Sequence, residues 1–389
     1  MGSRKSRLVV VLTTLFVLCS FSYAQQIVIA PGLDGSEYEL AVPANWNGTL
    51  VVYAHGIVDP QLPVALPDID TLKIPLLAAG FAVAYSSFSS NGYAVQDGME
   101  RTHELNAQFA AQFGKPKRTI LMGHSLGGLI VLALAEKYPK EYDGALPMCG
   151  VVGGSIPEVN YVANGRMLYD LFFSSGVFGT FPYDLPGNGG NPVVLPFSSL
   201  SDPAYVGVLT NFTDGFAAPN YITQQYAETV PLPVNWADPQ EVTTAAMTLV
   251  GFDIRYGSDL LARTHNRVPF TNVLTFYNDP LAMKLDWLIN ADVERYIAPP
   301  QALDYLSENY SPTGRLKIPM LTVHTTRDPV VPIWHEDIYN TLTKWNHSSN
   351  LLVQTKIDRY GHCTFTDQET LDAFQKLILW VEAGVKPAP

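Results

Sequence analysis

The sequence predicts an α/β fold: a mostly parallel central sheet with helices on both faces and a large segment inserted between two later strands. Short apolar runs rich in Val, Ile and Leu alternate with amphipathic helical segments over most of the chain. One long stretch, residues 155–315, interrupts that alternation. The composition, 47% hydrophobic and 15% charged over 389 residues, is that of a globular protein with a large core.

The first 24 residues predict a secretory signal peptide. Cations at positions 4, 5 and 7 precede an apolar run at 8–21, and the small residue Ala24 ends the segment. The run has 14 residues, fewer than the roughly 20 that a membrane-spanning helix needs. We therefore expect a secreted protein, extracellular or periplasmic, whose mature chain begins at Gln25 and has no integral membrane segment.

The strands are expected at the apolar runs. They lie at 49–54, 82–86, 118–122, 145–152, 320–325 and 351–357. Several of these runs lack alternation between apolar and polar residues, which is typical of strands covered on both faces in a parallel sheet. Helices with apolar residues at spacings of three and four are expected at 98–113, 128–138 and 367–383.

The interruption divides the mature chain into a main domain, formed by residues 25–154 and 316–389, and a cap or lid formed by residues 155–315. The cap holds 23 of the chain's 44 aromatic residues. Helices are expected from Pro280 to about Tyr296 and from Pro300 onward. The aromatic side chains either line a surface that faces a ligand or form the cap's own core, and the sequence leaves both interpretations open.

Charge and cysteine content argue against two classes of protein, nucleic-acid-binding proteins and disulfide-built scaffolds. The net charge of −12 argues against a nucleic-acid partner, which would require clustered cations. After removal of the signal peptide, only Cys149 and Cys363 remain, too few for a disulfide-built scaffold.

The most informative motif is a G-x-S-x-G pattern at Gly123, Ser125 and Gly127, directly after one expected strand and before an expected helix. A serine on such a sharp strand-to-helix turn has a strained backbone, and the two glycines let strand and helix approach closely. The turn exposes the hydroxyl at the helix N-terminus, where developing negative charge is favoured. Ser125 is therefore the expected nucleophile, and its neighbour His124 is expected to pack rather than react.

A serine that attacks a carbonyl also needs hydrogen-bond donors for the resulting oxyanion. One expected donor is the backbone amide of Leu126, which follows the nucleophile. The second is expected from the loop after the strand at 49–54, at the amide of Ile57 or, as an alternative, Val58. His55 in this loop is expected to order it.

The nucleophile needs a base, and a histidine is the usual choice near neutral pH. His362 is the best placed of the eight histidines, because it follows the strand at 351–357 and strand ends present catalytic groups in this fold class. His324, His335 and His347 are expected to have structural roles.

The base in turn needs a carboxylate that fixes its tautomer and stabilises its positive charge. Asp328 follows the strand at 320–325 and precedes a turn that contains two prolines. Two alternatives remain: Asp328 merely caps this turn, or Glu158 is the acid. The resulting chain order is Ser125, Asp328, His362.

Together these motifs resemble the α/β-hydrolase superfamily. The resemblance rests on residues 42–49, His55-Gly56, 123–128, 328–332 and Gly361-His362, and it covers about 25–154 and 316–389. It implies the α/β-hydrolase fold, with the inserted cap carrying most of the substrate specificity. Members are chiefly carboxylesterases and lipases, but also serine peptidases, thioesterases and C–C hydrolases. Members that act on haloalkanes or epoxides carry aspartate where this chain has Ser125.

Cys363, directly after His362, is similar to the tannase and feruloyl esterase group, in which that cysteine is bonded to one immediately before the serine. This chain departs from the pattern, because His124 precedes Ser125. The resemblance leaves open whether Cys149 replaces the missing partner in a Cys149–Cys363 disulfide or whether both are free thiols.

We therefore expect a secreted serine hydrolase, esterase-like or lipase-like, that cleaves carboxylic esters with a hydrophobic or aromatic group through an acyl-enzyme. Its expected partner is a small-molecule or polymeric ester, and no metal or cofactor is implied, since the His335-Glu336-Asp337 cluster lacks zinc-binding spacing. The alternatives are a secreted serine exopeptidase of the same fold and a non-catalytic binding protein. The oligomeric state is left open.

Overall fold

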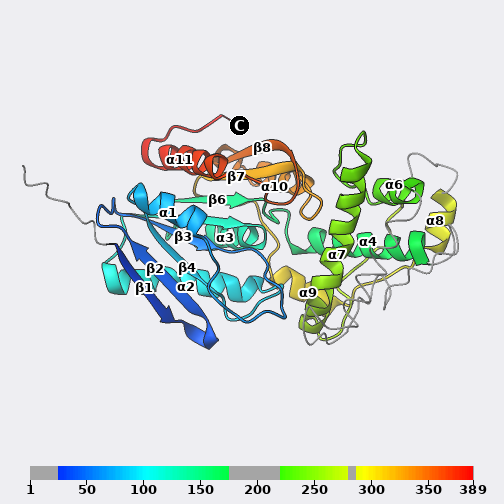
Figure 1. Ribbon diagram of the computed structural model, residues 1–389, viewed down its shortest axis with the longest axis horizontal. Helices are drawn as coiled ribbons and strands as arrows, with labels where there is room; N and C mark the ends of the chain where they lie inside the picture. The colour runs from blue at the N-terminus through cyan, green and yellow to red at the C-terminus, as the bar shows by residue number, and fades with distance from the viewer. Residues whose placement is uncertain (1–24, 175–219, 279–285, 389) are drawn as a thin grey trace, which may run out of the picture.

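The computed structural model describes residues 25–174, 220–278 and 286–388 (Figure 1). The expected signal peptide at 1–24 lies outside the described residues. So do the part of the expected cap at 175–219 and the expected helix start at Pro280. None of the helices in the described ranges is long and apolar enough to cross a membrane.

The centre of the molecule is an eight-stranded sheet with the order β1-β2-β4-β3-β5-β6-β7-β8. Its strands are β1 (Gln26–Pro31), β2 (Glu37–Val42), β3 (Thr49–Ala54), β4 (Ala82–Ser86), β5 (Arg118–His124), β6 (Gly144–Met148), β7 (Met320–Arg327) and β8 (Leu352–Tyr360). The pairs β1–β2 and β2–β4 are antiparallel, and every other pair is parallel. The predicted α/β fold class is therefore confirmed, and the topology is that of the α/β-hydrolase fold.

Two elements differ from the expected strands. The strand expected at 145–152 ends at Met148, because Cys149 takes a left-handed φ of 43° that interrupts the extended backbone. The hairpin of β1 and β2 was not expected from the sequence. The edge strand β1 has exposed apolar residues such as Ile27 and Ile29, so its side chains give no clear buried pattern.

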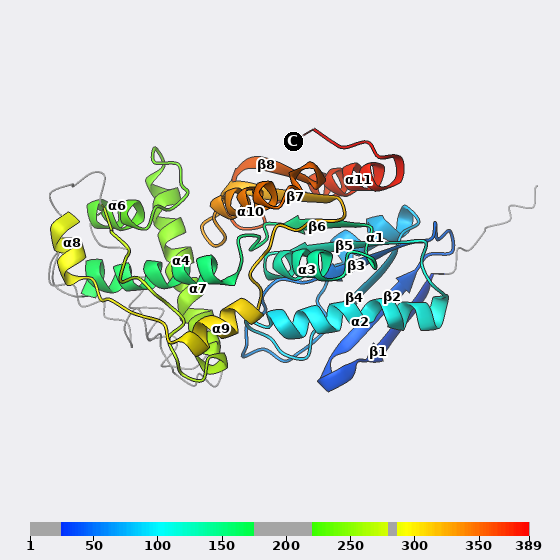
Figure 2. The same cartoon turned by 180° about the vertical axis from the view of Figure 1, so that it is seen from behind.

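Helices cover both faces of the sheet (Figures 1 and 2). One face packs against α2 (Val95–Phe113), α3 (Leu126–Lys137) and α10 (Trp334–Trp345), and the other against α1 (Asp70–Ala78) and α11 (Asp367–Ala383). Alternate residues of β5 face the two cores, as expected for a strand buried on both sides: Leu121 lies in the first core, and Ile120 and Met122 lie in the second.

The described part of the inserted segment is helical and lies beyond one end of the sheet (Figure 1). Its helices are α4 (Ser155–Tyr169), a short π-helix (Asp170–Ser174), α6 (Asn220–Thr229), α7 (Pro239–Arg263), α8 (Asp286–Asp292) and α9 (Pro300–Glu308). All of them except α9 contribute to a third core that contains Tyr169, Phe172 and Phe270. Several aromatic residues of this segment thus form its own core, one of the two interpretations that the sequence left open.

The helix expected to run to about Tyr296 ends at Asp292 instead. Beyond that point the backbone pairs with another part of the segment. The amide of Tyr296 donates to the side chain of Asn272, and the amide of Asn272 donates to the carbonyl of Tyr296. These hydrogen bonds between two distant stretches of the segment replace the bonds that a longer helix would have made.

Candidate active site

Ser125 occupies the turn between β5 and α3 with φ of 55° and ψ of −121°, a conformation that is strained for a residue with a side chain. At both flanking glycines a side chain would overlap with backbone atoms. A Cβ atom at Gly123 would lie 2.4 Å from the carbonyl oxygen of Gly127, and one at Gly127 would lie 2.1 Å from that of Ala54. The backbone amide of Ser125 donates to the carbonyl of Met148, at 2.9 Å, which fixes the turn to the end of β6.

The structure brings Ser125, His362 and Asp328 together. The Ser125 hydroxyl donates to Nε2 of His362 at 2.8 Å, and Nδ1 of His362 donates to Oδ2 of Asp328 at 2.7 Å. Both the serine and the aspartate are buried, whereas the histidine side chain is 22% exposed. The tautomer follows from the contacts, because a proton on Nδ1 leaves Nε2 free to accept the serine proton.

The loop after β7 fixes the carboxylate of Asp328. Its Oδ1 accepts hydrogen bonds from the amides of Val330 and Val331, at 2.9 and 3.0 Å. The side chain is completely buried. These bonds are of the kind that an aspartate makes when it caps a turn, so the capping role and the contact with His362 coexist in one residue.

Glu158, the alternative acid, lies in a different pair. Nε2 of His335 donates to the Glu158 carboxyl group at 2.9 Å, and Nδ1 of the same ring accepts from the amide of Gly153. Burial raises the pKa of Glu158 to about 8, with a further contribution from the charge of Asp328. Burial lowers the pKa of His335 to about 3.

His124, next to Ser125, and His55, in the loop after β3, both contact neighbouring protein groups. His124 accepts a hydrogen bond from Tyr53 at 3.2 Å, and burial, with the nearby charge of His362, lowers the pKa of His124 to about 4. His55 donates from Nδ1 to the carbonyl of Gly56 and stacks on Phe88, with ring centroids 3.8 Å apart. His55 thus contacts the backbone of its own loop.

The loop of His55, Gly56 and Ile57 lies against the serine. A Cβ atom at Gly56 would be 3.3 Å from Cβ of Ser125 and 3.8 Å from its Oγ. Leu126 is the first residue of α3, so its amide has no acceptor one turn earlier within the helix. The two segments expected to carry oxyanion donors therefore both adjoin Ser125.

Cys149 and Cys363 are joined by a disulfide. The bond links the residue after His362 to the end of β6, and Sγ of Cys363 lies 3.4 Å from Nε2 of His362. The ligand atoms of Cys149, His362 and Cys363 lie within 4.8 Å of one another, as in a metal site. Because the two sulfurs are bonded to each other, they are not available as thiolate ligands.

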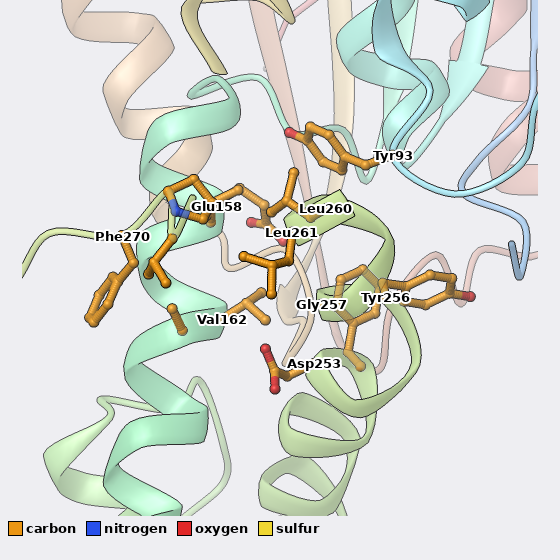
Figure 3. A pocket seen from close by; sticks show the side chains of 14 residues that line it. Tyr93, Glu158, Val162, Asp253, Tyr256, Gly257, Leu260, Leu261 and Phe270 are labelled. Carbon is orange, nitrogen blue, oxygen red and sulfur yellow. The ribbon is translucent and has the colours of Figure 1, made fainter. Parts of the chain in front are cut away.

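An apolar pocket lies between α4 and α7, beside Tyr93 from the loop after β4 (Figure 3). In Figure 3 the side chains of Val162 and Leu261 and the carboxyl group of Asp253 lie in the space between the two helices. Glu158 also lines the pocket, close enough to Asp328 and His362 that both charges affect its pKa.

The two carboxyl groups of the pocket have partners. Asp253 lies 3.6 Å from the guanidinium of Arg166, and burial raises the pKa of Asp253 to about 6 against the opposing effect of that cation. Glu158 is paired with His335. The sequence did not indicate this pocket, because apolar spacing in a helix predicts a buried face without showing whether that face is filled.

Comparison with known proteins gives one family match and distant relatives. Residues 51–170 match the model of a family described as putative esterase. A curated relative, o-phthalyl amidase of Xanthobacter agilis, is 22% identical over 91% of this chain and 87% of its own.

Solved structures with similarity include an esterase of Pyrococcus furiosus and feruloyl esterase B of Aspergillus oryzae. The first has a TM-score of 0.45 with 13% identity and covers 92% of this chain and 90% of its own. The second has a TM-score of 0.47 with 15% identity and covers 94% and 81%. The sheet topology is that of the α/β-hydrolase fold, and residues 51–170 are similar to a family of putative esterases, which supports a hydrolase.

Proposed function

We propose that the protein is a serine hydrolase that cleaves carboxylic esters bearing a hydrophobic or aromatic group, through an acyl-enzyme. The observation that carries the proposal is the hydrogen bond of 2.8 Å between the Ser125 hydroxyl and Nε2 of His362. A serine hydroxyl becomes an effective nucleophile when a base accepts its proton, and a carboxylate behind that base stabilises the resulting imidazolium.

In the first step, Oγ of Ser125 bonds to the ester carbonyl carbon while His362 takes the hydroxyl proton. The tetrahedral intermediate then collapses, the bond to the alkoxy oxygen breaks, and His362 gives its proton to the departing alcohol. In the second step, His362 takes a proton from water as the water oxygen attacks the acyl carbon. The acid leaves, and the proton returns to Ser125.

The amides of Leu126 and Ile57 are the proposed oxyanion donors. The close approach of Gly56 to Ser125 supports this assignment, since it brings the loop within reach of a carbonyl bonded to Oγ. Loss of one such donor costs on the order of 3 kcal/mol of barrier.

The pocket between α4 and α7 supports a hydrophobic or aromatic group on the substrate. Its wall is formed largely by aliphatic and aromatic side chains, including Val159, Phe252 and Leu260. A pocket with mostly apolar walls favours an uncharged ligand group, which loses little hydration on entering it. The inserted segment would then act as the cap proposed from the sequence.

The two acidic residues of the pocket already have partners, which favours esterase activity over the alternative exopeptidase activity. An exopeptidase would need a carboxylate free to bind the substrate's N-terminal ammonium. Glu158 is paired with His335, and Asp253 with Arg166.

Amide cleavage remains a second candidate, because the curated relative is named an amidase. The name of that relative also includes an aromatic acyl group, which agrees with the proposed preference. Comparing an aryl ester, the matching aryl-acyl amide and an aminoacyl amide at equal concentration separates the three possibilities. Exclusive cleavage of either amide would overturn the ester proposal.

We also propose that the protein is secreted. The signal-peptide pattern at 1–24 supports export, and a disulfide is typical of proteins in oxidising compartments. Detection of the chain in the culture medium or periplasm, with Gln25 as its first residue, tests this proposal.

The decisive variant for the mechanism is Ser125→Ala. We expect it to fold normally, with an unchanged thermal unfolding midpoint, and to lose at least about 10³-fold in kcat for an aryl ester, because the acyl-enzyme cannot form. Rapid labelling by an organophosphonate should occur in the wild type and disappear in the variant. Near-normal turnover in Ser125→Ala would refute the proposed nucleophile, and an unreactive wild type would favour the non-catalytic binding protein.

A further inference from the structure

A second imidazole lies beside the carboxylate of Asp328. Nε2 of His324, in β7, is 3.6 Å from Oδ2 of Asp328, the oxygen that also accepts from His362. His324 is completely buried, and its Nε2 also donates to the carbonyl of Val331. Its role must therefore be exerted through Asp328.

The other nitrogen of His324 faces an acid. Nδ1 lies 3.4 Å from Oε1 of Glu336, in α10, and this carboxyl group is also buried. Its second oxygen, Oε2, accepts hydrogen bonds from the Thr322 hydroxyl at 2.6 Å and from the side-chain amide of Gln354 at 2.5 Å. Two donors on Oε2 hold the Glu336 side chain in place and leave Oε1 facing the ring of His324.

The protonation state of His324 follows from its two neighbours. Nε2 donates to the carbonyl of Val331 at 2.7 Å and therefore carries a proton. A second proton on Nδ1 would face Oε1 of Glu336, 3.4 Å away, and this ion-pair geometry favours the imidazolium form of His324. Burial opposes this charge, but Glu336, Asp328 and the Val331 carbonyl outweigh it and raise the pKa of His324 above its ordinary value.

Three other titratable groups lie near His324: Glu158, His335 and His362. The charge of His324 influences Glu158, in α4, which is itself raised to a pKa of about 8 by burial, and His335, in α10, whose pKa is lowered to about 3 by burial. His362 lies on the far side of the shared Asp328 oxygen in the hydrogen-bond chain. The ion pair with Glu336 is therefore the contact that most directly keeps His324 protonated.

We propose that His324 and Glu336 form a buried positioning pair that holds a positive charge beside Asp328 and so keeps His362 free to act as a base at lower pH. The inference rests on the proposed serine mechanism. Asp328 stabilises a protonated His362, which cannot accept the proton of Ser125. A cation 3.6 Å from Asp328 partly offsets that effect, while Glu336, on the other side of the ring, keeps the cation in place.

The test is Glu336→Gln. The glutamine amide oxygen still accepts from Thr322 and Gln354, and its NH₂ group faces Nδ1 of His324, so these hydrogen bonds are kept while the ring loses its ionic partner. We expect the acid limb of the kcat/KM profile for an aryl ester to move to higher pH by roughly 0.5 to 1 unit. At a pH above the acid limbs of both the wild type and the variant, kcat/KM of the variant should differ from that of the wild type by less than threefold.

A readout independent of activity is the side-chain ¹⁵N NMR signal of His324 at pH 7.5. We expect an imidazolium pattern in the wild type and a neutral ring in Glu336→Gln. Tyr339→Phe is the matched control, because Tyr339 is buried in the same helix and hydrogen-bonds only to Glu136 among the contacts described. It should lower stability and leave both the acid limb and the His324 signal unchanged.

The outcomes are distinct. An unshifted acid limb in Glu336→Gln, or a neutral His324 in the wild type, overturns the pair while leaving the nucleophile assignment intact. Turnover by Ser125→Ala would instead overturn the proposed function. If Glu336→Gln does not fold, the double variant His324→Gln, Glu336→Gln removes both charges and carries the same expected shift, and an unshifted limb there also overturns the proposal.

Discussion

Gly127 is the residue at which the turn around Ser125 tolerates the least change. The position where a Cβ atom would be placed is only 2.1 Å from the carbonyl oxygen of Ala54, which belongs to the central strand β3. Neither atom belongs to a flexible side chain that could move away. The sequence motif predicted this requirement, because a close strand-to-helix approach is the physical reason for a glycine at this place.

We therefore expect Gly127→Ala to lower the free energy of unfolding by roughly 3 kcal/mol through this overlap. Urea unfolding followed by circular dichroism measures the loss. Gly384→Ala is a suitable control, since nothing lies within 4 Å of the added atom and only its left-handed φ of 68° and ψ of 13° oppose the change, at about 1 kcal/mol. Equal losses in the two variants would contradict the steric explanation.

Glu158 gives a prediction about pH. Its pKa is raised to about 8 in the folded protein, so folding favours the protonated carboxyl group. The stabilising contribution is complete at pH values below its ordinary pKa and is lost as the pH rises toward about 8. We expect Glu158→Gln to flatten the decline in stability between pH 5 and pH 8.5, as measured by chemical unfolding.

The control for this measurement is Glu308→Gln, at an exposed position at the end of α9. It should leave the pH dependence of stability as it is in the wild type. A Glu158→Gln profile parallel to that of the wild type would show that this carboxyl group does not hold its proton in the folded state.

At the scale of elements, apolar periodicity predicted the buried strands and several helices well. β3, β4 and α11 have the bounds expected from the sequence. It failed for the edge strand β1 and for the end of β6, where backbone conformation and solvent exposure decide the element. Local hydrophobic patterns report burial, so elements that are exposed or terminated by a single left-handed residue escape them.

The pair α4 and α7 allows a test of the proposed substrate pocket. Ala163, in α4, lines the pocket, and Ala163→Phe would fill part of it. We expect KM for an aryl benzoate to rise roughly tenfold, while KM for the corresponding acetate changes little, because only the larger acyl group needs the space. Steady-state kinetics with the two esters measures the difference.

Gln240→Phe is the matched control, since this residue is exposed in the first turn of α7 and does not line the pocket. It adds the same side chain to a helix of the same segment. An equal increase of KM for acetate and benzoate in Ala163→Phe would show that the pocket does not hold the acyl group.

At the scale of the whole molecule, the disulfide joins residues that are 214 positions apart and closes a loop containing the entire inserted segment. The sulfur of Cys363 lies beside His362. The bond therefore both stabilises the folded chain and holds the loop of the proposed base against the end of β6. The sequence alone left this pairing open, because both free thiols and a bridge were compatible with two cysteines.

We expect the double variant Cys149→Ala, Cys363→Ala to lose about 2 to 4 kcal/mol of stability and several-fold in kcat, since the loop of His362 is no longer fixed to β6. Reduction of the wild type by dithiothreitol should give the same change, and the double variant should not respond to the reductant. Unchanged unfolding and turnover in the reduced wild type would contradict this expectation.

The sequence by itself determined the fold class and the strand, turn and helix around Ser125. These features depend on residues close together in the chain, whose periodicity and glycine spacing carry the information. Only the tertiary structure decided that Cys149 and Cys363 are joined, that Glu158 pairs with His335, and that His324 and Glu336 stand behind Asp328. Such contacts depend on strand order and loop paths, which bring distant residues to one edge of the sheet and leave no local pattern.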